Sequence, residues 1–179
     1  MKFTPFPELK TERLLLRKIE TTDCDVILFL RSDETVNAYI ERPESRKTKN
    51  KADALKFIEK IEENLDTEQS IAWGITLQNN PQIIGTICLW NFSEDRKTAE
   101  VGYDLNPKFH KKGIMSEALK ATINYGFNSL NLNKIEAFTH KNNESSKHLL
   151  EKNGFKHGAH RKDLDNNANF IFERYKAAL

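Results

Sequence analysis

The sequence has few cysteines, little net charge and no long hydrophobic run. Its 179 residues include only two cysteines, Cys24 and Cys88, which lie far apart in apolar segments. Two cysteines at this separation form neither a metal-ligand spacing nor a disulfide framework. We therefore expect two buried, reduced thiols, as in a cytoplasmic protein.

Charge and hydropathy argue against two classes of partner. The chain carries 28 Lys+Arg against 26 Asp+Glu, a formal charge of +2, and so lacks the basic excess typical of nucleic-acid-binding proteins. The longest unbroken apolar run, residues 26–30, is far shorter than the roughly 20 residues of a membrane span. Residues 1–7 contain no apolar stretch resembling a secretory signal. We expect a cytoplasmic protein with no nucleic-acid partner and no membrane partner.

Histidine is also scarce, and its distribution does not indicate a metal site. The five histidines form no i, i+4 pair and no cluster with carboxylates or cysteines; they are His110, His140, His148, His157 and His160. Metal sites in proteins need several such ligands together. We expect these histidines in loops and on the surface, and no metal cofactor.

The apolar pattern in the first part of the chain predicts two helices and several strands. Residues 21–23 supply N-cap hydroxyls and a first-turn acid, so a helix should start there and continue through residue 30. Beyond a polar loop at 42–50, apolar residues at helical spacing predict an amphipathic helix over Lys51–Asp66. Turn residues 79–81 should join two strands as an antiparallel hairpin. The expected strands are residues 12–17, 70–77, 82–90 and 98–105.

From residue 113 onward, helices alternate with strands. We expect helices at 113–130 and 143–153, the second capped by Asn143 and ended at Gly154. Strands are expected at 134–140, from Phe155 onward and at 169–175. The order implies one mixed α/β (α+β) sheet with helices packed on it, and the length corresponds to about one domain.

The junction between the strand at 98–105 and the helix starting at Gly113 has features of an anion site. The first N–H groups of a helix lack partners and, with the helix dipole, attract anions. Gly113 has no Cβ to obstruct a phosphate, and Lys111 and Lys112 add positive charge. A solvated basic loop with an ordinary glycine explains the same spacing, and the spacing alone favours neither interpretation.

The junction resembles the acyl-CoA pyrophosphate loop of the GNAT superfamily of N-acetyltransferases. That pattern is Gln/Arg, two residues, Gly, one residue and Gly/Ala, whereas this sequence has His110, Gly113 and Met115 there, so only the central glycine matches strictly. Other segments are similar to the ribosomal-protein-alanine N-acetyltransferase subgroup; they are residues 11–17, 99–103, 113–119 and 143–155. Together they cover nearly the whole chain in order.

The resemblance implies a GNAT-like acyl-CoA N-acyltransferase fold over residues 1–179 as a single N-acetyltransferase domain. Such a fold has a central, mostly antiparallel sheet with a splayed strand pair and flanking helices. Acetyl-CoA, the implied cosubstrate, lies in the gap between the strand of Glu100 and the strand at 134–140. The implied cofactor-binding residues are Tyr103, Asp104, Leu105, His110, Lys111, Lys112, Gly113, Ile114, Met115, Asn143 and Ser146.

The same resemblance suggests candidate catalytic residues. An amine must lose a proton before it attacks a thioester, and Glu100 is the first candidate base. A strand glutamate in an ordinary ion pair is an equally open interpretation, and Asp104, two pleats along the same face, is the second candidate. Ser146 matches a family serine that can protonate the departing sulfur, or it is only a polar residue in a first helical turn. Trp73 is expected in the core; core packing is also favoured for Trp90 over a place in the acceptor site.

The leading hypothesis is an acetyl-CoA-dependent N-acetyltransferase that acts on a primary amine. The acceptor would be a protein N-terminal α-amine, such as that of a ribosomal protein, or a small-molecule amine. Loops at 39–50 and 157–167 would flank the acceptor channel. The alternative is a catalytically weak acyl-CoA-binding sensor or interaction protein on the same fold, motivated by His110 and Met115. A homo-oligomer is left open.

Overall fold

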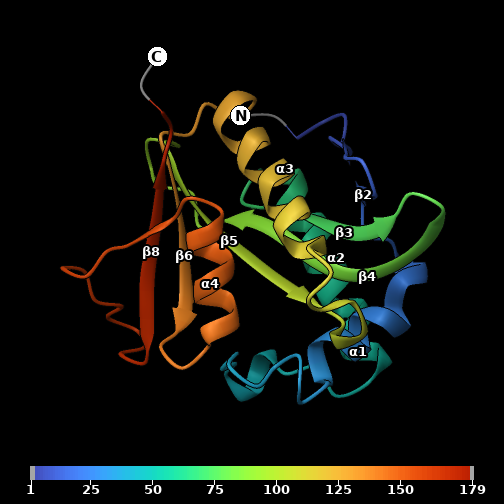
Figure 1. Cartoon of the computed structure of the whole chain (residues 1–179). Helices are drawn as coiled ribbons and strands as arrows, with labels where there is room; N and C mark the ends of the chain where they lie inside the picture. Colours follow the sequence, from blue (N-terminus) through green and yellow to red (C-terminus); the bar gives the residue numbers. More distant parts are fainter. Residues whose placement is uncertain (1–2, 178–179) are drawn as a thin grey trace.

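An eight-stranded sheet runs through the molecule in the order β1-β2-β3-β4-β5-β6-β8-β7 (Figure 1). The computed structural model describes residues 3–177. The strands are β1 (Leu9–Lys10), β2 (Leu14–Arg17), β3 (Ile71–Leu77), β4 (Asn80–Trp90), β5 (Thr98–Leu105), β6 (Lys134–His140), β7 (Lys156–His157) and β8 (Asn169–Tyr175). All neighbouring strands pair antiparallel except β5 and β6, which are parallel.

The parallel pair opens after a short stretch of pairing. Thr98–Glu100 of β5 lie in register with Lys134–Glu136 of β6, and no pairing follows, although both strands continue. Figure 1 shows β5 and β6 diverging from this point, so that β6 and β8 stand apart from the β3–β5 part of the sheet. The splayed pair implied by the family resemblance is therefore present, with Glu100 and Glu136 where it begins to open.

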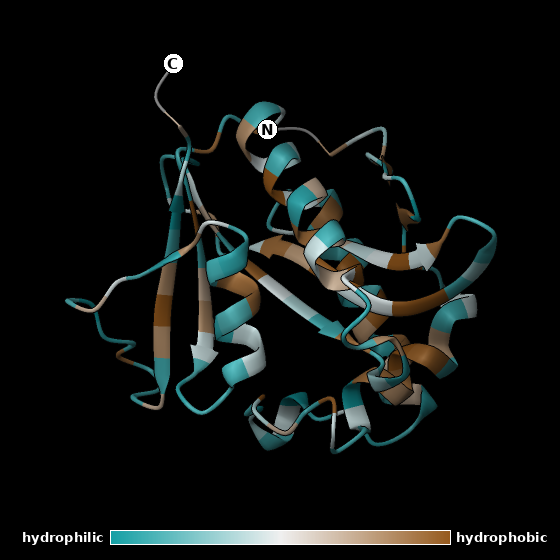
Figure 2. Cartoon of the chain, in the orientation of Figure 1, coloured by the Kyte–Doolittle hydropathy of each residue, from teal (hydrophilic) through white to brown (hydrophobic). Residues whose placement is uncertain are grey.

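Helices cover the sheet from both sides. α3 (Ile114–Asn128) and α4 (Glu144–Lys152) contribute to the larger buried cluster, which holds Trp73 and most apolar strand residues. α1 (Cys24–Ser32) and α2 (Lys51–Asp66) form a second cluster with Ile19 and Ile83. Hydrophobic residues are concentrated in the strands and in the helices packed on them, and the loops are largely hydrophilic (Figure 2).

Several predicted elements agree closely with the structure. The helix Lys51–Asp66 and the strands Thr98–Leu105 and Lys134–His140 have the expected bounds. Asn143 caps α4 by accepting from the N–H of Ser146 at 3.1 Å, and Gly154, with φ of 80°, follows the helix end. The hairpin of β3 and β4 is also confirmed.

Other expectations need correction at their boundaries. The turn predicted at 79–81 lies one residue earlier, since β4 begins at Asn80 and Pro81 is in the strand. Proline is tolerated near a strand start, where a ladder N–H is not needed. The start of the first helix is closed by carboxylates rather than hydroxyls: Glu20 and Asp23 form a capping box around a 3-10 turn at Thr21–Asp23. The predicted loop at 42–50 contains a short 3-10 helix, Glu44–Arg46.

The cysteines and Trp90 are less buried than expected, whereas Trp73 lies in the core as predicted. Cys24 and Cys88 are free, but both are only partly buried, and burial raises the pKa of the Cys88 thiol to about 12. Trp73 is fully buried, and its Nε1 donates to the Pro7 carbonyl at 2.7 Å. Trp90 is 44% exposed, so the core position favoured for it is wrong.

Candidate active site

The loop before α3 is shaped by two left-handed residues. The side chain of Asn106 accepts from the N–H of Lys108 and starts a short 3-10 turn, Pro107–Phe109. Lys111 and Gly113 then adopt φ of 58° and 74°. Gly113 is the N-cap of α3, and a Cβ placed on it would lie 3.4 Å from Nη2 of Arg13. The loop therefore needs glycine for its conformation, and a side chain there would also reach its neighbour.

The start of α3 offers free donors to an anion. Gly113 has no side chain to cap the helix, and within residues 3–177 no side chain accepts from the N–H groups of residues 114–116. Lys111 and Lys112 are exposed beside these groups. The side chains of Ile114 and Met115 are buried, so these residues present only their backbone outward. Unpaired N–H groups, the helix dipole and nearby cations fit a diphosphate.

The His110 side chain contacts the protein backbone and is not a free donor for a phosphate. Its Nε2 lies 3.0 Å from the carbonyl oxygen of Leu105, so the ring ties the loop back to the end of β5. The resemblance implied cofactor contact for both residues, and the structure brings them together at the loop.

Arg13 and Glu117 brace this loop, and sequence reasoning missed them. Arg13 Nε donates to Glu117 Oε2 at 2.7 Å, and Arg13 Nη1 donates to the carbonyl of Lys112 at 3.0 Å. Thr11 Oγ1 also donates to Glu117, at 2.6 Å. Arg13 lies in the segment that resembles the family, and that resemblance is the only signal in the sequence that pointed to it.

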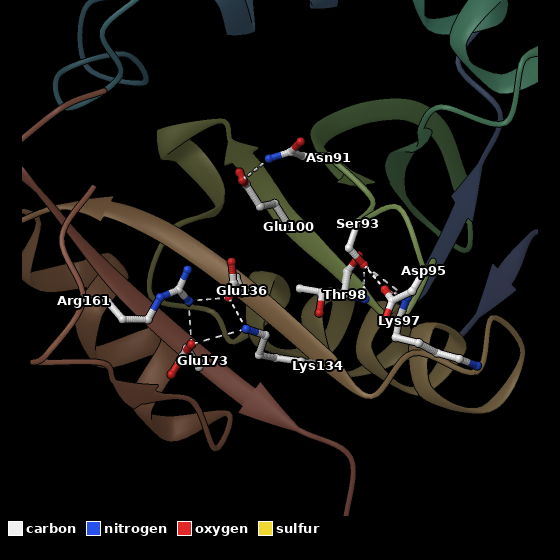
Figure 3. A network of polar contacts seen from close by, with 10 residues as sticks. All are labelled: Asn91, Ser93, Asp95, Lys97, Thr98, Glu100, Lys134, Glu136, Arg161 and Glu173. Carbon is white, nitrogen blue, oxygen red and sulfur yellow. Dashed lines mark hydrogen bonds and ion pairs between the residues drawn. The ribbon is translucent and has the colours of Figure 1, made fainter. Parts of the chain in front are cut away.

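Glu100 lies where β5 and β6 begin to separate. Its Oε1 accepts from Asn91 Nδ2 at 2.5 Å (Figure 3). Burial raises the pKa of Glu100, and the negative charges of Glu136 and Asp163 add to this effect. A partly buried carboxylate with a raised pKa at an opening in the sheet is suited to accept a proton.

Asp104 faces the same side of β5 as Glu100 but is held by β4. Its Oδ1 accepts from both the N–H and the hydroxyl of Thr86 at 2.9 Å. Burial raises the pKa of Asp104 to about 6, against the opposing effects of the Thr86 hydrogen bonds and of Arg42 and Arg31. The two candidate bases therefore differ in role, since Asp104 also secures the contact between β4 and β5.

On the opposite face of β5, Tyr103 and Ser146 meet across the opening. The Tyr103 hydroxyl lies 2.8 Å from Ser146 Oγ in the first turn of α4. Burial raises the pKa of Tyr103 to about 12, which keeps its proton at neutral pH. The site thus has two hydroxyls on one face of the gap and the carboxylate of Glu100 on the other.

A buried ion-pair network lies beside Glu100 (Figure 3). Arg161 Nη1 donates to Oε1 of Glu136 and to Oε1 of Glu173, and Lys134 Nζ pairs with the same Glu136 oxygen at 2.5 Å. Both glutamates are buried, and they are register partners on β6 and β8. Sequence reasoning missed this network, although two strands that each carry one glutamate were predicted.

The two loops expected to flank the acceptor channel touch each other. Asn166 Nδ2 donates to Glu41 Oε2 at 3.1 Å, and the rings of Tyr39 and His140 are 5.5 Å apart. Trp90 lies on the face of the sheet that carries Glu100 and Asp104. Gly102 is between these two residues on the same face of β5, and a Cβ placed on it would be 3.7 Å from Trp90 Nε1. This side of the opening, which we call the acceptor face, carries Trp90, Glu100, Asp104, Glu136 and Glu173.

Within residues 3–177, no group of three or more His, Cys, Asp and Glu residues is arranged to hold a metal ion. No helix in the same part of the chain is both long and apolar enough to cross a membrane.

Comparisons with known proteins identify relatives of the chain. The family model described as acetyltransferase (GNAT) domain matches residues 13–156. The uncharacterized N-acetyltransferase YoaA of Bacillus subtilis (strain 168) is 33% identical over 152 residues, with 84% of this chain and 83% of YoaA covered. An acetyltransferase of the GNAT family from Bacillus anthracis aligns with a TM-score of 0.79 at 26% identity, covering 94% of this chain and 98% of that one.

A third protein shares the fold at low sequence identity. RimL, the ribosomal L7/L12 alpha-N-protein acetyltransferase, was solved in complex with coenzyme A. It aligns with a TM-score of 0.80 at 16% identity, covering 94% of this chain and 98% of RimL. At this identity the likeness is one of fold alone.

Proposed function

Because the chain belongs to the GNAT acetyltransferase family, we propose that it transfers an acetyl group from acetyl-CoA to a primary amine by direct attack. The observation that carries the proposal is the start of α3, where free N–H groups follow the left-handed Gly113 beside the opening between β5 and β6. We propose that the whole chain acts as one catalytic domain in the cytoplasm.

The residues present fit a bound acyl-CoA. The backbone of residues 110–115 would hold the diphosphate, with Lys111 and Lys112 adding charge. The edge of β5 at Tyr103–Leu105 is unpaired on its β6 side and would pair with the pantetheine amides, as an added strand does. Asn143 and Ser146 border the same gap from α4.

Each side of the opening supplies one part of the chemistry. Bound acetyl-CoA supplies a thioester, so no covalent enzyme nucleophile is needed. Glu100 would take the proton of the amine, directly or through a water. Ser146, in contact with Tyr103, would donate a proton toward the leaving sulfur. Asp104 is the second candidate base; its hydrogen bonds to Thr86 support a role in holding β4 and β5.

The acceptor is a protein N-terminal α-amine or a small amine. RimL is named for a ribosomal protein acceptor, and this supports the first class by likeness of fold. His110 and Met115 depart from the family pattern, and this motivated the alternative of a catalytically weak sensor. The structure gives no sign that either residue obstructs the proposed cofactor site. The Met115 side chain is buried away from the loop, and the His110 ring is engaged with Leu105.

Thiol release from acetyl-CoA with a panel of amines and peptides tests the proposal, alongside calorimetric binding of acetyl-CoA. We expect binding and acceptor-dependent thiol release. Tight binding with no turnover over a wide panel would favour the sensor, and absence of binding would refute the cofactor site itself.

A further inference from the structure

Arg31, in the last turn of α1, has a guanidinium held by neutral partners. Its Nε donates to Thr48 Oγ1 at 2.7 Å, and its Nη2 donates to the carbonyl of Arg46 at 3.0 Å. The guanidinium carbon lies 3.6 Å from the ring centroid of Phe57. These contacts fix the plane of the group without compensating its charge, since no carboxylate of residues 3–177 forms an ion pair with it.

Arg42 lies at the same end of α1 and is also held by a neutral group. Its Nη1 donates to Asn37 Oδ1, and Asn37 Nδ2 donates to the carbonyl of Leu30 at 3.0 Å. Burial lowers the pKa of Arg42 and lowers that of Arg31 to about 10, an effect to which the charge of Arg42 contributes. The two cations, which we call the arginine pair, are therefore partly desolvated, and Asn37 links Arg42 to the end of α1 that carries Arg31.

The arginine pair lies beside the loops that flank the acceptor face, since Glu41, the residue before Arg42, accepts from Asn166 at 3.1 Å. The negative charge of Asp104, on that face, opposes the lowering of the pKa of both arginines by burial. Its Oδ1 is already occupied by Thr86, and one negative charge does not balance two positive ones. A guanidinium has five N–H donors in a fixed fork, and most of those in the pair have no protein acceptor. Preoriented, uncompensated donors of this kind match a carboxylate or a phosphate.

We propose that the arginine pair binds an anionic group of the acceptor, so that the acceptor is an amine that also carries a carboxylate or a phosphate. This inference rests on the proposed function, because it takes the acceptor face as the place where the amine binds. Glu100 and Asp104 are separated along β5 by roughly 13 Å, at about 3.3 Å per residue. If the amine of the acceptor is at Glu100, the anionic group of the same molecule must therefore be several bonds away from that amine. An acidic side chain near the N-terminus of a peptide meets this requirement.

Matched acceptors test the charge requirement. Ala-Ala-Glu-amide is compared with Ala-Ala-Gln-amide for the carboxylate, and Ala-Ala-phosphoserine-amide with Ala-Ala-Ser-amide for the phosphate, at constant ionic strength. Spermidine serves as a purely cationic amine. We expect kcat/KM to be roughly tenfold higher for at least one anionic peptide than for its neutral partner. The pair that shows the difference identifies the anion.

Variants then assign the preference to the arginine pair. Arg42→Gln should raise KM for the anionic peptide by roughly tenfold and leave KM for its neutral partner and for acetyl-CoA unchanged. Arg46→Gln is the control, because it removes an exposed arginine from the same loop. Equal kcat/KM within both peptide pairs, or a preference that survives in Arg42→Gln, would overturn the inference.

A binding measurement separates this inference from the proposed function. The Nα-acetylated forms of the same peptides are titrated calorimetrically into the CoA-bound protein, which requires no turnover. Tighter binding of the anionic form, lost in Arg42→Gln, supports the arginine pair even if no acceptor is acetylated. Equal binding of the anionic and neutral forms refutes it even if turnover with other amines confirms the proposed function.

Discussion

Arg13 and Glu117 meet at the start of α3 although 104 residues separate them in the sequence. Glu117 accepts from the backbone N–H of Arg13 at 2.9 Å and from its Nε at 2.7 Å. Burial opposes ionisation of Glu117, but hydrogen bonds from Thr11 and Arg13 outweigh it and lower its pKa. A bare carboxylate in the first turns of α3 would repel a diphosphate, so the contact neutralises a charge that the proposed cofactor site could not tolerate.

Replacing Arg13 with Gln should weaken CoA binding. The change leaves the charge of Glu117 unbalanced beside the loop and removes the hydrogen bond to the Lys112 carbonyl. Because the Arg13 side chain is 47% exposed, we expect a loss of no more than about 1 kcal/mol, roughly fivefold in Kd by calorimetry. Lys10→Gln, an exposed change on β1, should have no effect. If Arg13→Gln combined with Glu117→Gln does not recover affinity, charge neutralisation is the wrong reason.

Gly113→Ala should reduce both stability and CoA affinity. A residue with a Cβ is strained at φ of 74°, at a cost of about 1 kcal/mol. Gly154→Ala is a matched control, since Gly154 has φ of 80° and its nearest neighbouring atom would be 3.6 Å from the new Cβ. Both variants should unfold at similarly lower temperature, but only Gly113→Ala should bind CoA more weakly. Equal affinities in the two variants would remove this loop from the cofactor site.

Glu100→Gln should lower kcat and leave acetyl-CoA affinity nearly unchanged. General base catalysis typically supplies about 10²–10⁴-fold, which sets the scale of the loss. The base acts when ionised, and burial raises the pKa of Glu100, so wild-type kcat/KM should rise with pH through that raised pKa. The loss in the variant should shrink at high pH, where more of the amine is already neutral.

Asp104→Asn is the companion variant for Glu100→Gln. Asparagine keeps an oxygen that can accept from the N–H and hydroxyl of Thr86, so the link between β4 and β5 should survive. With Glu100 as the base, Asp104→Asn should retain most of the turnover. The opposite result, with Glu100→Gln fully active and Asp104→Asn inactive at neutral pH, would assign the base to Asp104.

Ser146→Ala and Tyr103→Phe should each lower kcat less than Glu100→Gln does. The CoA thiol is already a fairly good leaving group, with a pKa near the usual thiol value of about 8.5, so a proton donor matters less than a base. The two hydroxyls share one hydrogen bond of 2.8 Å, and their losses should not add in the double variant. Thermal stability of Ser146→Ala should change little, because Asn143 still caps α4. Unchanged kcat in both single variants would exclude the hydroxyls from the reaction.

The elements that could be predicted from the sequence are those with a local physical cause. α2 follows from apolar residues at helical spacing, and β5 and β6 from short segments in which apolar and polar residues are mixed, the first ended by Asn106 and Pro107. Gly113 was identifiable because a helix start beside lysines needs no distant partner to attract an anion. In each case the signal lies within one turn or one strand.

The features that could not be predicted depend on segments that meet only in the folded chain. Arg161 belongs to a polar loop with no periodicity, and its partners Glu136 and Glu173 are on two separate strands. The exposure of Trp90 depends on which helices cover its face of the sheet. The alternation of residues along β4 does not predict which face is covered. Nor does any local pattern join Asn166 to Glu41.

Arg161→Gln tests whether the buried network stabilises the acceptor face through charge. The change leaves Glu136 and Glu173 with Lys134 as their remaining cation. Breaking a fully buried ion pair costs about 3–5 kcal/mol. The loss here should be smaller, because the Arg161 side chain is 34% exposed and Lys134 is retained. We expect a lower free energy of unfolding in urea at pH 8. Lys162→Gln, an exposed change in the same loop, should leave it unaltered.

The pH dependence of this loss separates charge from packing. Burial opposes ionisation of Glu136, but Lys134 and Arg161 outweigh it and lower its pKa. A carboxylate with a lowered pKa in the folded state contributes stability above its unfolded value of about 4.3, and that stability is lost as pH falls through the folded value. The difference between wild type and Arg161→Gln should therefore be large from pH 8 down to about pH 4.3, and should shrink as pH falls further through the lowered pKa of Glu136 in the folded state. Because the positive charge of Arg161 also lowers the pKa of Glu100, the rise of kcat/KM with pH should move to higher pH in the variant. A stability difference that stays constant from pH 8 to below the folded-state pKa of Glu136, with an unshifted activity profile, would mean that Arg161 acts only by packing.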